Sequence, residues 1–467
     1  MTKGKYDFTE GPLFWRLILF ALPVMATGIL QMLYNAADKF VVGQFSGDPN
    51  ALGAIGCTAT LGAVIINFMA GIGGGTGVVI AQLYGGKRYA ETSRAVHTSL
   101  ILAFALSLGL TVIGYLTLEP MLRLLGTQEI FMENAKLYLE ITFIGIVATA
   151  VYNFGASILR ATGDSKTPLI IGTVSGLINV VLNLFFVICF KMSVDGVALA
   201  TIISQYFSAI VVIVVLMRRE GECYQFSFSK LAVDTTLLRR IIRIGVPTGL
   251  QSCCFSFTNL AVVGAVNTSF PDTYVTAFSV SSNIDGFLDV TSGAFMQSSM
   301  NATGQNYGAM KPDRVRRVFW YSLAQASGFV FILSMIMRIF RSEIGGFFVE
   351  AGAVGREEII FAVAEWTGVM LATYFMQGAM NAVLGTVRGL GYSILPLVFN
   401  IVGTCVTRLI YVYCIFPLPP FHSFAGLAML YPVSWTTATL MLSILVLVAF
   451  RKIRNLEEGK EKVNLDT

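Results

Sequence analysis

Charged residues interrupt the long apolar stretches of this chain and are the first candidates for function. Asp38 lies near the end of an apolar run, and Arg408 lies inside another run. Ionisable groups are costly inside a bilayer, and where they occur they mark ion or proton pathways. Asp38 could therefore bind and release a proton or a small cation such as Na⁺. The alternative is that Asp38 and Lys39 lie at the outer mouth of the protein, where they only contact water.

Asparagines surround this carboxylate in the predicted helices of the same half of the chain. Asn179 and Asn183 are four residues apart, so they share one face of a helix. These amides could donate hydrogen bonds to Asp38 or offer carbonyl oxygens to Na⁺. Interhelical packing by hydrogen bonds is an equally open interpretation. The predicted cation-coupling set is Asp38, Asn35, Asn153, Asn179 and Asn183.

The second half of the chain carries its own charged set. Asp285 and Asp289 are again four residues apart and share a helix face. A buried arginine needs a partner, so we expect Arg408 to pair with Asp285 or Asp289. A purely structural salt bridge and a second coupling site both remain open for these residues.

Flexible and aromatic side chains in the apolar runs could line a cavity for varied organic molecules. In any membrane protein, side chains of this kind also pack against other helices or face lipid. The predicted cavity residues are Met32, Phe255, Phe287 and Tyr374.

Motifs for enzymatic chemistry are missing from the sequence. The glycines between positions 71 and 77 lack the Lys-Ser/Thr that follows a phosphate-binding loop, and small-residue helix packing explains them better. His97 and His422 are single, and the seven cysteines have no metal-ligand spacing. We therefore expect no cofactor and no catalytic residue, and no metal beyond a possible Na⁺ at Asp38.

The composition shows which solvent these residues face. The chain has 467 residues, of which 55% are hydrophobic and 13% charged, and its mean hydropathy is +0.72. Soluble proteins carry about 25% charged residues, so this chain is expected in a lipid bilayer. The net charge of +5 comes from short basic clusters between apolar runs, which suits anionic lipid and not nucleic acid.

A membrane-spanning helix needs about 20 apolar residues, and the sequence offers twelve such runs. They extend over Leu13 to Val42, Ala51 to Leu83, Ala95 to Leu118, Leu137 to Leu159, Pro168 to Phe190, Val194 to Met217, Ile241 to Val266, Tyr274 to Thr303, Val318 to Phe340, Ile359 to Val387, Tyr392 to Pro417 and Phe424 to Phe450. The predicted fold class is thus an all-α integral membrane protein with twelve transmembrane helices.

Lys and Arg concentrate in one set of alternate loops, as the positive-inside rule requires of cytoplasmic loops. With an even number of helices, both termini then lie in the cytoplasm. No signal-peptide cleavage site follows the first apolar run. We therefore expect a multi-pass protein of the cell's inner (plasma) membrane.

The two halves of the chain repeat each other. Pro23 and Asn35 recur with the same spacing as Pro247 and Asn259, and Arg160 to Pro168 recurs as Arg388 to Pro396. Two six-helix lobes related by a pseudo-twofold axis along the membrane normal are the architecture of rocking secondary transporters. The predicted parts are an N-lobe (1–217), a cytoplasmic linker (218–240), a C-lobe (241–450) and a cytoplasmic tail (451–467).

At these repeated segments the sequence resembles the multidrug and toxin extrusion (MATE) family of cation-coupled exporters. The resemblance rests on Tyr34 to Asp38 with Pro23 before it, on the loops around Gln82 and Gln305, and on the segments before Pro168 and Pro396. It implies a monomeric antiporter that uses H⁺ or Na⁺ to export amphipathic, cationic organic compounds by alternating access. Pro23 and Pro247 are the expected hinges.

Two departures from the family pattern bear on coupling. Some relatives have an aspartate where this chain has Asn183, and another branch has a glutamate in the seventh helix, where this chain has Gln251 and Ser252. The N-lobe site therefore has a single carboxylate. A flippase for lipids or glycan-lipids is the alternative within transport, although its cavity should be more basic. An integral-membrane enzyme is the alternative from another class, although no clustered catalytic set supports it.

Overall fold

The computed structural model describes residues 6–48, 50–124, 126–350, 352 and 354–457, and these residues contain helices and no strand. Most of the predicted tail 451–467 lies outside the described residues. The chain forms two compact units. Unit 1 comprises Met1–Asp7 and Ala26–Ser252, and unit 2 comprises Phe8–Met25 and Cys253–Thr467.

Two long helices contribute to both units. Helix α1 (Leu13–Phe45) gives its first part to unit 2 and the rest to unit 1, whereas α7 (Thr235–Ser269) does the reverse. Both contain a proline, Pro23 in α1 and Pro247 in α7. The division between the units falls within a few residues after each proline, at Met25 and Ser252.

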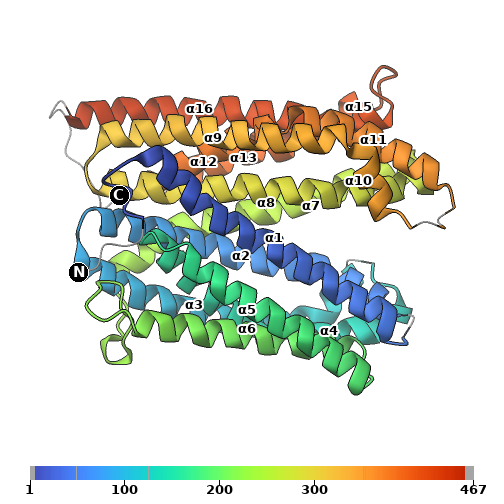
Figure 1. The fold of residues 1–467 in the computed structure, drawn as a ribbon, viewed down its shortest axis with the longest axis horizontal. Coiled ribbons are helices and arrows are strands. Elements are labelled where there is room, and N and C mark those ends of the chain that lie inside the picture. Colours follow the sequence, from blue (N-terminus) through green and yellow to red (C-terminus); the bar gives the residue numbers. More distant parts are fainter. Residues whose placement is uncertain (1–5, 49, 125, 351, 353, 458–467) are drawn as a thin grey trace. The chain divides into compact units, whose positions relative to one another are not determined.

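The remaining helices of unit 1 pack next to one another (Figure 1). They are α2 (Ala51–Gly85), α3 (Tyr89–Leu124), α4 (Glu129–Ala161), α5 (Lys166–Leu184) with the π-helical turn η1 (Phe185–Cys189), α6 (Val194–Met217) and the short 3₁₀ turn η2 (Phe228–Lys230). Helix α4 packs against α2, α3 and α6, so it is the centre of this unit.

Unit 2 holds the rest of the chain. Its helices are α8 (Asp272–Gly308), α9 (Pro312–Ile339), α10 (Arg341–Phe348), α11 (Arg356–Thr373), α12 (Phe375–Gly389), α13 (Ile394–Asn400), α14 (Thr407–Ile410), α15 (Phe424–Ala428) and α16 (Leu430–Glu457), with π-helical turns η3 (Ile401–Val406) and η4 (Tyr411–Ile415). Helix α12 packs against α8, α9 and α16.

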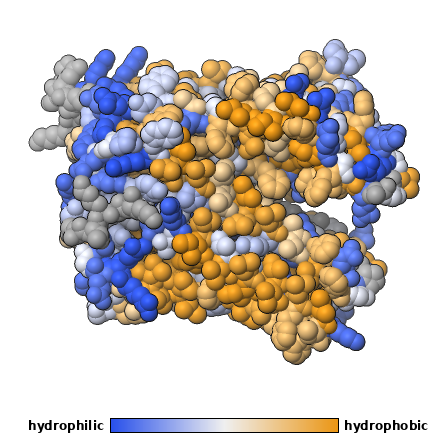
Figure 2. Space-filling model, viewed as in Figure 1, coloured by the Kyte–Doolittle hydropathy of each residue, from blue (hydrophilic) through white to orange (hydrophobic). Residues whose placement is uncertain are grey.

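Each of the twelve predicted apolar runs lies mainly in helical structure. Among the described residues, ten helices are long and apolar enough to cross a membrane, and an eleventh span results if α11 and α12, bent by 46°, are joined. Helix α8 has 37 residues, enough to cross, but its serines, asparagines and three aspartates make it too polar to qualify by composition. On the visible face, hydrophobic residues cover the middle parts of the helices and hydrophilic residues gather at the helix ends (Figure 2).

The internal repeat extends to the backbone. Gly163 and Gly391, at matching places in the two halves, both have φ of +94°. Residues other than glycine rarely adopt this backbone conformation. Lys87 and Met310, also at matching places, both have φ of +56°. The same left-handed turns therefore follow α2 and α8, and also α4 and α12.

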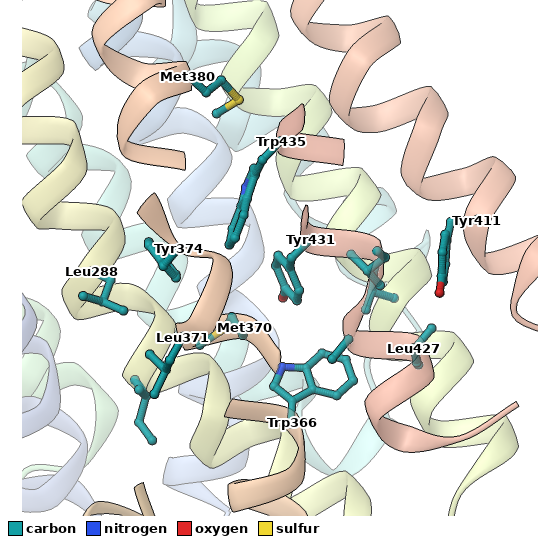
Figure 3. Close-up of a cluster of buried hydrophobic side chains, with 14 of the residues drawn as sticks. Leu288, Trp366, Met370, Leu371, Tyr374, Met380, Tyr411, Leu427, Tyr431 and Trp435 are labelled. Carbon is teal, nitrogen blue, oxygen red and sulfur yellow. The ribbon is translucent and has the colours of Figure 1, made fainter. Parts of the chain in front are cut away.

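The core of unit 2 is rich in aromatic side chains (Figure 3). Trp435 lies between Tyr374 and Tyr431, with ring centroids 4.9 and 5.3 Å away. Trp366 and Trp435 are each only 1% exposed. Large rigid rings fix the positions of the helices that carry them, and the same helices carry the polar side chains of unit 2.

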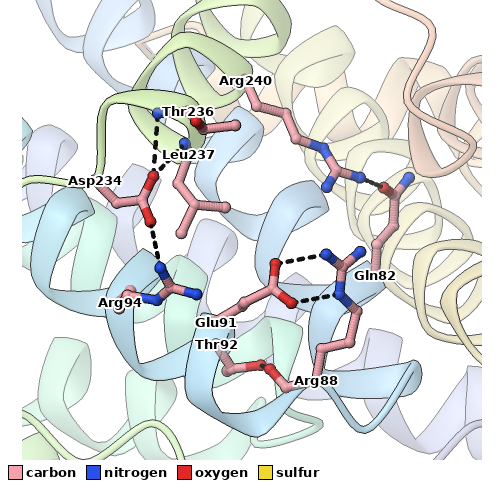
Figure 4. A network of polar contacts seen from close by, with 9 residues as sticks. All are labelled: Gln82, Arg88, Glu91, Thr92, Arg94, Asp234, Thr236, Leu237 and Arg240. Atoms are coloured by element: carbon pink, nitrogen blue, oxygen red, sulfur yellow. Dashed lines mark hydrogen bonds and ion pairs between the residues drawn. The ribbon is translucent and has the colours of Figure 1, made fainter. Parts of the chain in front are cut away.

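The predicted linker 218–240 lies in unit 1, where polar contacts hold the start of α7 against α2 and α3 (Figure 4). Asp234 accepts hydrogen bonds from the backbone N–H groups of Thr236 and Leu237 at the start of α7, and it forms a 3.0 Å ion pair with Arg94. Arg240, one turn into α7, donates to Gln82. These contacts fix the direction in which α7 leaves the linker.

The chain before α1 is held in unit 2 in a comparable way. Arg314 donates to the backbone oxygens of Phe8, Glu10 and Gly11 over 2.8 to 3.1 Å. Gln305, the repeat counterpart of Gln82, accepts from the N–H of Phe8. Both helices shared by the units thus start from a segment fixed by hydrogen bonds.

Candidate functional site

The predicted N-lobe site forms in unit 1 around Asp38. The side-chain amide of Asn183, on α5, donates a hydrogen bond to Asp38 Oδ1, on the second part of α1. Asn183 is fully buried, and Asp38 is half-buried. The carboxylate of Asp38 is thus held by a buried amide while part of the residue stays accessible.

The polar contacts continue from Asn183 to α6. Asn183 Nδ2 also lies 3.3 Å from Asn179 Oδ1, and Asn179 Nδ2 donates to Thr201 Oγ1 over 3.3 Å. The carbonyl oxygen of Asn183 is buried and has no hydrogen-bond partner within the described residues. An unpartnered buried oxygen costs free energy, and here it lies one amide group away from a carboxylate. Carboxylate and amide oxygens are the kind of ligand that a hard cation prefers.

The other two predicted amides lie apart from this chain of contacts. Asn35 is exposed on α1, and Asn153 is half-buried on α4. Neither forms a hydrogen bond with Asp38 among the residues that the structure describes. Thr201 and Tyr138, which interacts electrostatically with Asp38, were not predicted, because a single Thr or Tyr in an apolar helix gives no signal of its own.

In unit 2, Asp285 and Asp289 of α8 face the start of α12 and the residue just before it. Asp285 Oδ1 accepts a 2.6 Å hydrogen bond from Tyr374 OH, and Asp289 Oδ1 accepts a 2.9 Å bond from Gln377 Nε2. One turn beyond Asp289 on α8, Ser292 accepts from Asn381 over 2.8 Å. This ladder uses one face of each helix, so the predicted shared face of Asp285 and Asp289 is correct.

The expected ion pair of Arg408 with Asp285 or Asp289 is wrong. Arg408 Nε donates to Ser434 Oγ and Nη1 to Asn259 Oδ1, each over 3.2 Å, and the guanidinium lies 4.8 Å from the centre of the Tyr431 ring. Among the described residues, no carboxylate lies within ion-pair distance of Arg408. The π-helical turns on both sides of α14 change the direction of its side chains, and the aspartates bind α12 instead.

The predicted cavity residues differ in exposure. Tyr374 is fully buried in the aromatic core and bonded to Asp285, so its side chain does not line an open surface. Met32, Phe255 and Phe287 are half-buried, on α1, α7 and α8. These three side chains keep part of their surface accessible.

A model of the MatE family matches residues 23–185 and 247–414 of the chain. The chain belongs to the MatE family. The two matched segments begin at Pro23 and Pro247, so each half of the chain carries one copy of the MatE repeat. The resemblance seen in the sequence is confirmed.

Known proteins of this family cover most of the chain. It is 28% identical to the probable multidrug resistance protein YpnP of Bacillus subtilis over 407 residues, which are 86% of this chain and 88% of the relative. It is 24% identical to an FAD transporter of Shewanella oneidensis, with 74% and 76% covered. A crystal structure of a MATE protein in complex with MaL6 matches with a TM-score of 0.88 at 19% identity, covering 97% of this chain and 100% of that one.

Membership of the MatE family makes this chain a multi-pass membrane transporter of small molecules and not an enzyme. A structure in the outward-facing conformation matches equally well, with a TM-score of 0.88 at 19% identity over 97% of this chain and 99% of that one. At such low identity the structural matches establish the fold alone. No group of three or more His, Cys, Asp or Glu side chains in the described part of the chain could hold a metal ion.

Proposed function

We propose that this MatE transporter is an antiporter that couples H⁺ or Na⁺ entry to the export of amphipathic, cationic organic compounds by alternating access. The observation that carries the proposal is the Asp38 site, with its half-buried carboxylate and the unpartnered buried oxygen of Asn183. The names of the Bacillus subtilis relatives, two probable multidrug resistance proteins, support export of varied organic compounds.

Coupling requires that cation and substrate favour different states of the transporter, because a ligand that binds both states equally shifts nothing. A proton on Asp38 converts the carboxylate into a donor and changes its bond with Asn183. Na⁺ would instead be held by Asp38 and by amide or hydroxyl oxygens of Asn183, Asn179 or Thr201. With one carboxylate, each cycle neutralises at most one charge at this site.

The same proposal assigns the motion to the predicted lobes, 1–217 and 241–450, with Pro23 and Pro247 as hinges. A proline inside a helix removes one backbone hydrogen bond and permits a bend. Asp38 lies beyond Pro23 on α1, so a change in the Asp38–Asn183 contact alters the part of α1 that bends. Both termini then lie in the cytoplasm, and one chain suffices for the cycle.

The test uses purified protein in liposomes with a fluorescent organic cation on one side. A pH gradient and a Na⁺ gradient are imposed separately, and uphill movement of the cation is followed. We expect one of the two gradients to drive transport. Glu140→Gln is the matched control, because Glu140 lies on α4 outside the described polar contacts of Asp38. The proposal fails if neither gradient drives transport while substrate still crosses downhill.

A further inference from the structure

Arg408 carries a buried positive charge that has no role in the proposed cation site. Its side chain lies in a membrane-spanning helix and is only 6% exposed, and it has no acidic partner within the described residues. A guanidinium has five N–H groups. One donates to Ser434 and one to Asn259, so three remain without an acceptor in the described part of the chain. A buried charge with unused donors is costly unless something binds it.

The internal repeat shows which residues of unit 1 correspond to Arg408 and its neighbours in unit 2. Asn259, which Arg408 contacts, is the counterpart of Asn35, and Val262 is the counterpart of Asp38. Arg408 itself lies near the counterpart of Asn179. Where unit 1 has a carboxylate among amides, unit 2 therefore has a guanidinium beside an amide and a buried valine, 2% exposed. The two counterpart sites have opposite charge.

The protein holds this guanidinium in a fixed position. Ser434 and Tyr431 lie one turn apart on α16, and Tyr431 is itself packed against Trp366 and Trp435. Asn259, on the other side, is exposed, so the guanidinium meets an accessible surface of α7. An arginine fixed in this way has the planar donor pattern that matches a carboxylate or a phosphate.

The nearby aspartates narrow the class of ligand. Asp285 bonds to Tyr374, whose ring packs on Trp435, and Trp435 packs on the Tyr431 ring that lies beside Arg408. Asp289, one turn along α8, bonds to Gln377. A ligand with negative charge alone is repelled by the two aspartates, and one with positive charge alone is repelled by Arg408. A ligand that carries both charges can place its anionic group at Arg408 and its cationic group toward the two aspartates.

We propose that Arg408 is the anion-binding residue of a substrate site in unit 2, where it binds the carboxylate of amphipathic zwitterionic compounds. This inference rests on the proposed export function and specifies its substrate class. Asn259, Ser434 and Tyr431 are positioning residues that orient the guanidinium.

The experiment uses two probes that differ only in the anionic group. One is an amphipathic xanthene dye with a cationic ring system and a carboxylate, and the other is the methyl ester of the same dye. Binding of each to purified protein in detergent is measured by fluorescence anisotropy. Because a hydrogen bond to a charged group contributes about 1.5–3 kcal/mol, the acid should bind wild-type protein about 10- to 100-fold more tightly than the ester.

Arg408→Gln should remove this preference by weakening the acid alone, and Arg408→Lys should restore part of it because the positive charge returns. Equal binding of acid and ester to wild-type protein would overturn the proposal, whatever the stability of the variants. Equal weakening of both dyes in Arg408→Gln, with no rescue by lysine, would assign Arg408 a structural role instead. Asp38→Asn separates the two proposals, since it should lose uphill transport and keep the preference for the acid.

Discussion

The side-chain amide of Asn183 donates a hydrogen bond to the carboxylate of Asp38 across 145 residues of sequence. The contact joins α5 to the part of α1 that follows Pro23. It places the carboxylate of Asp38 against a buried amide that has a second, unpartnered polar atom. A change of charge at this acid would therefore alter a contact between two helices.

Asp38→Asn should abolish gradient-driven export and leave the protein folded. An amide at position 38 can still exchange hydrogen bonds with Asn183, but it cannot bind a proton or balance the charge of Na⁺. Uphill dye transport in liposomes and thermal unfolding in detergent measure the two effects. Full uphill transport by this variant would rule out the site.

Asn183→Ala should reduce the apparent affinity of the coupling cation, because it removes both the bond to Asp38 and the buried oxygen. The matched control is Asn35→Ala on α1, since Asn35 is exposed and has no described bond to Asp38. Transport rate is measured against cation concentration for both variants. Equal effects of the two substitutions would contradict the geometry of the site.

Arg408 and Asp289 should behave as nearly independent residues in unfolding experiments. A buried ion pair loses about 3–5 kcal/mol when one partner is removed, whereas here each residue bonds to neutral groups. In a double-mutant cycle of Arg408→Gln and Asp289→Asn, we expect a coupling energy below about 1 kcal/mol. A value near that of a buried pair would show that the two side chains pair directly.

Gly75→Ala should destabilise unit 1, because a Cβ at Gly75 would lie 2.5 Å from the backbone nitrogen of Gly245 on α7. Neither backbone can yield without moving a helix, so we expect a loss of about 1–3 kcal/mol. Gly74→Ala is the neighbouring control, since nothing lies within 4 Å of its Cβ position. An alanine there should be neutral or stabilising by up to about 1 kcal/mol. Similar unfolding of both variants would disprove the close crossing of α2 and α7.

Asp48, between α1 and α2, should make stability depend on pH. The backbone N–H of Asn50 holds the pKa of Asp48 below its ordinary value, helped by the side chains of Asn134 and Ser193. A lowered folded-state pKa stabilises the protein fully above the unfolded value, about 3.9, and the stabilisation disappears as pH falls through the folded value.

The measurement is the melting temperature of wild-type protein and Asp48→Asn between neutral and acidic pH. The melting temperature of the wild type should exceed that of Asp48→Asn by a constant amount near neutral pH. This difference should shrink once the pH falls below about 4. A difference that stays constant down to the lowest pH would show that ionised Asp48 contributes nothing.

The sequence alone predicted the membrane-spanning helices, the repeat and Asp38 as a candidate coupling residue. These follow from local requirements, because a bilayer demands about 20 apolar residues per span and makes a charge inside one unusual. The i,i+4 spacing also determined that Asp285 and Asp289 share a face.

Only the tertiary structure decided what each face meets. Spacing along one helix defines a face, but the partner on a neighbouring helix depends on rotation, bending and packing of both. Asn183 therefore contacts Asp38 while Asn35 does not, and the aspartates of α8 bond to Tyr374 and Gln377 instead of Arg408. The π-helical turns beside Arg408 shifted its side chain toward Asn259 and Ser434, and no apolar periodicity in the sequence encodes such turns.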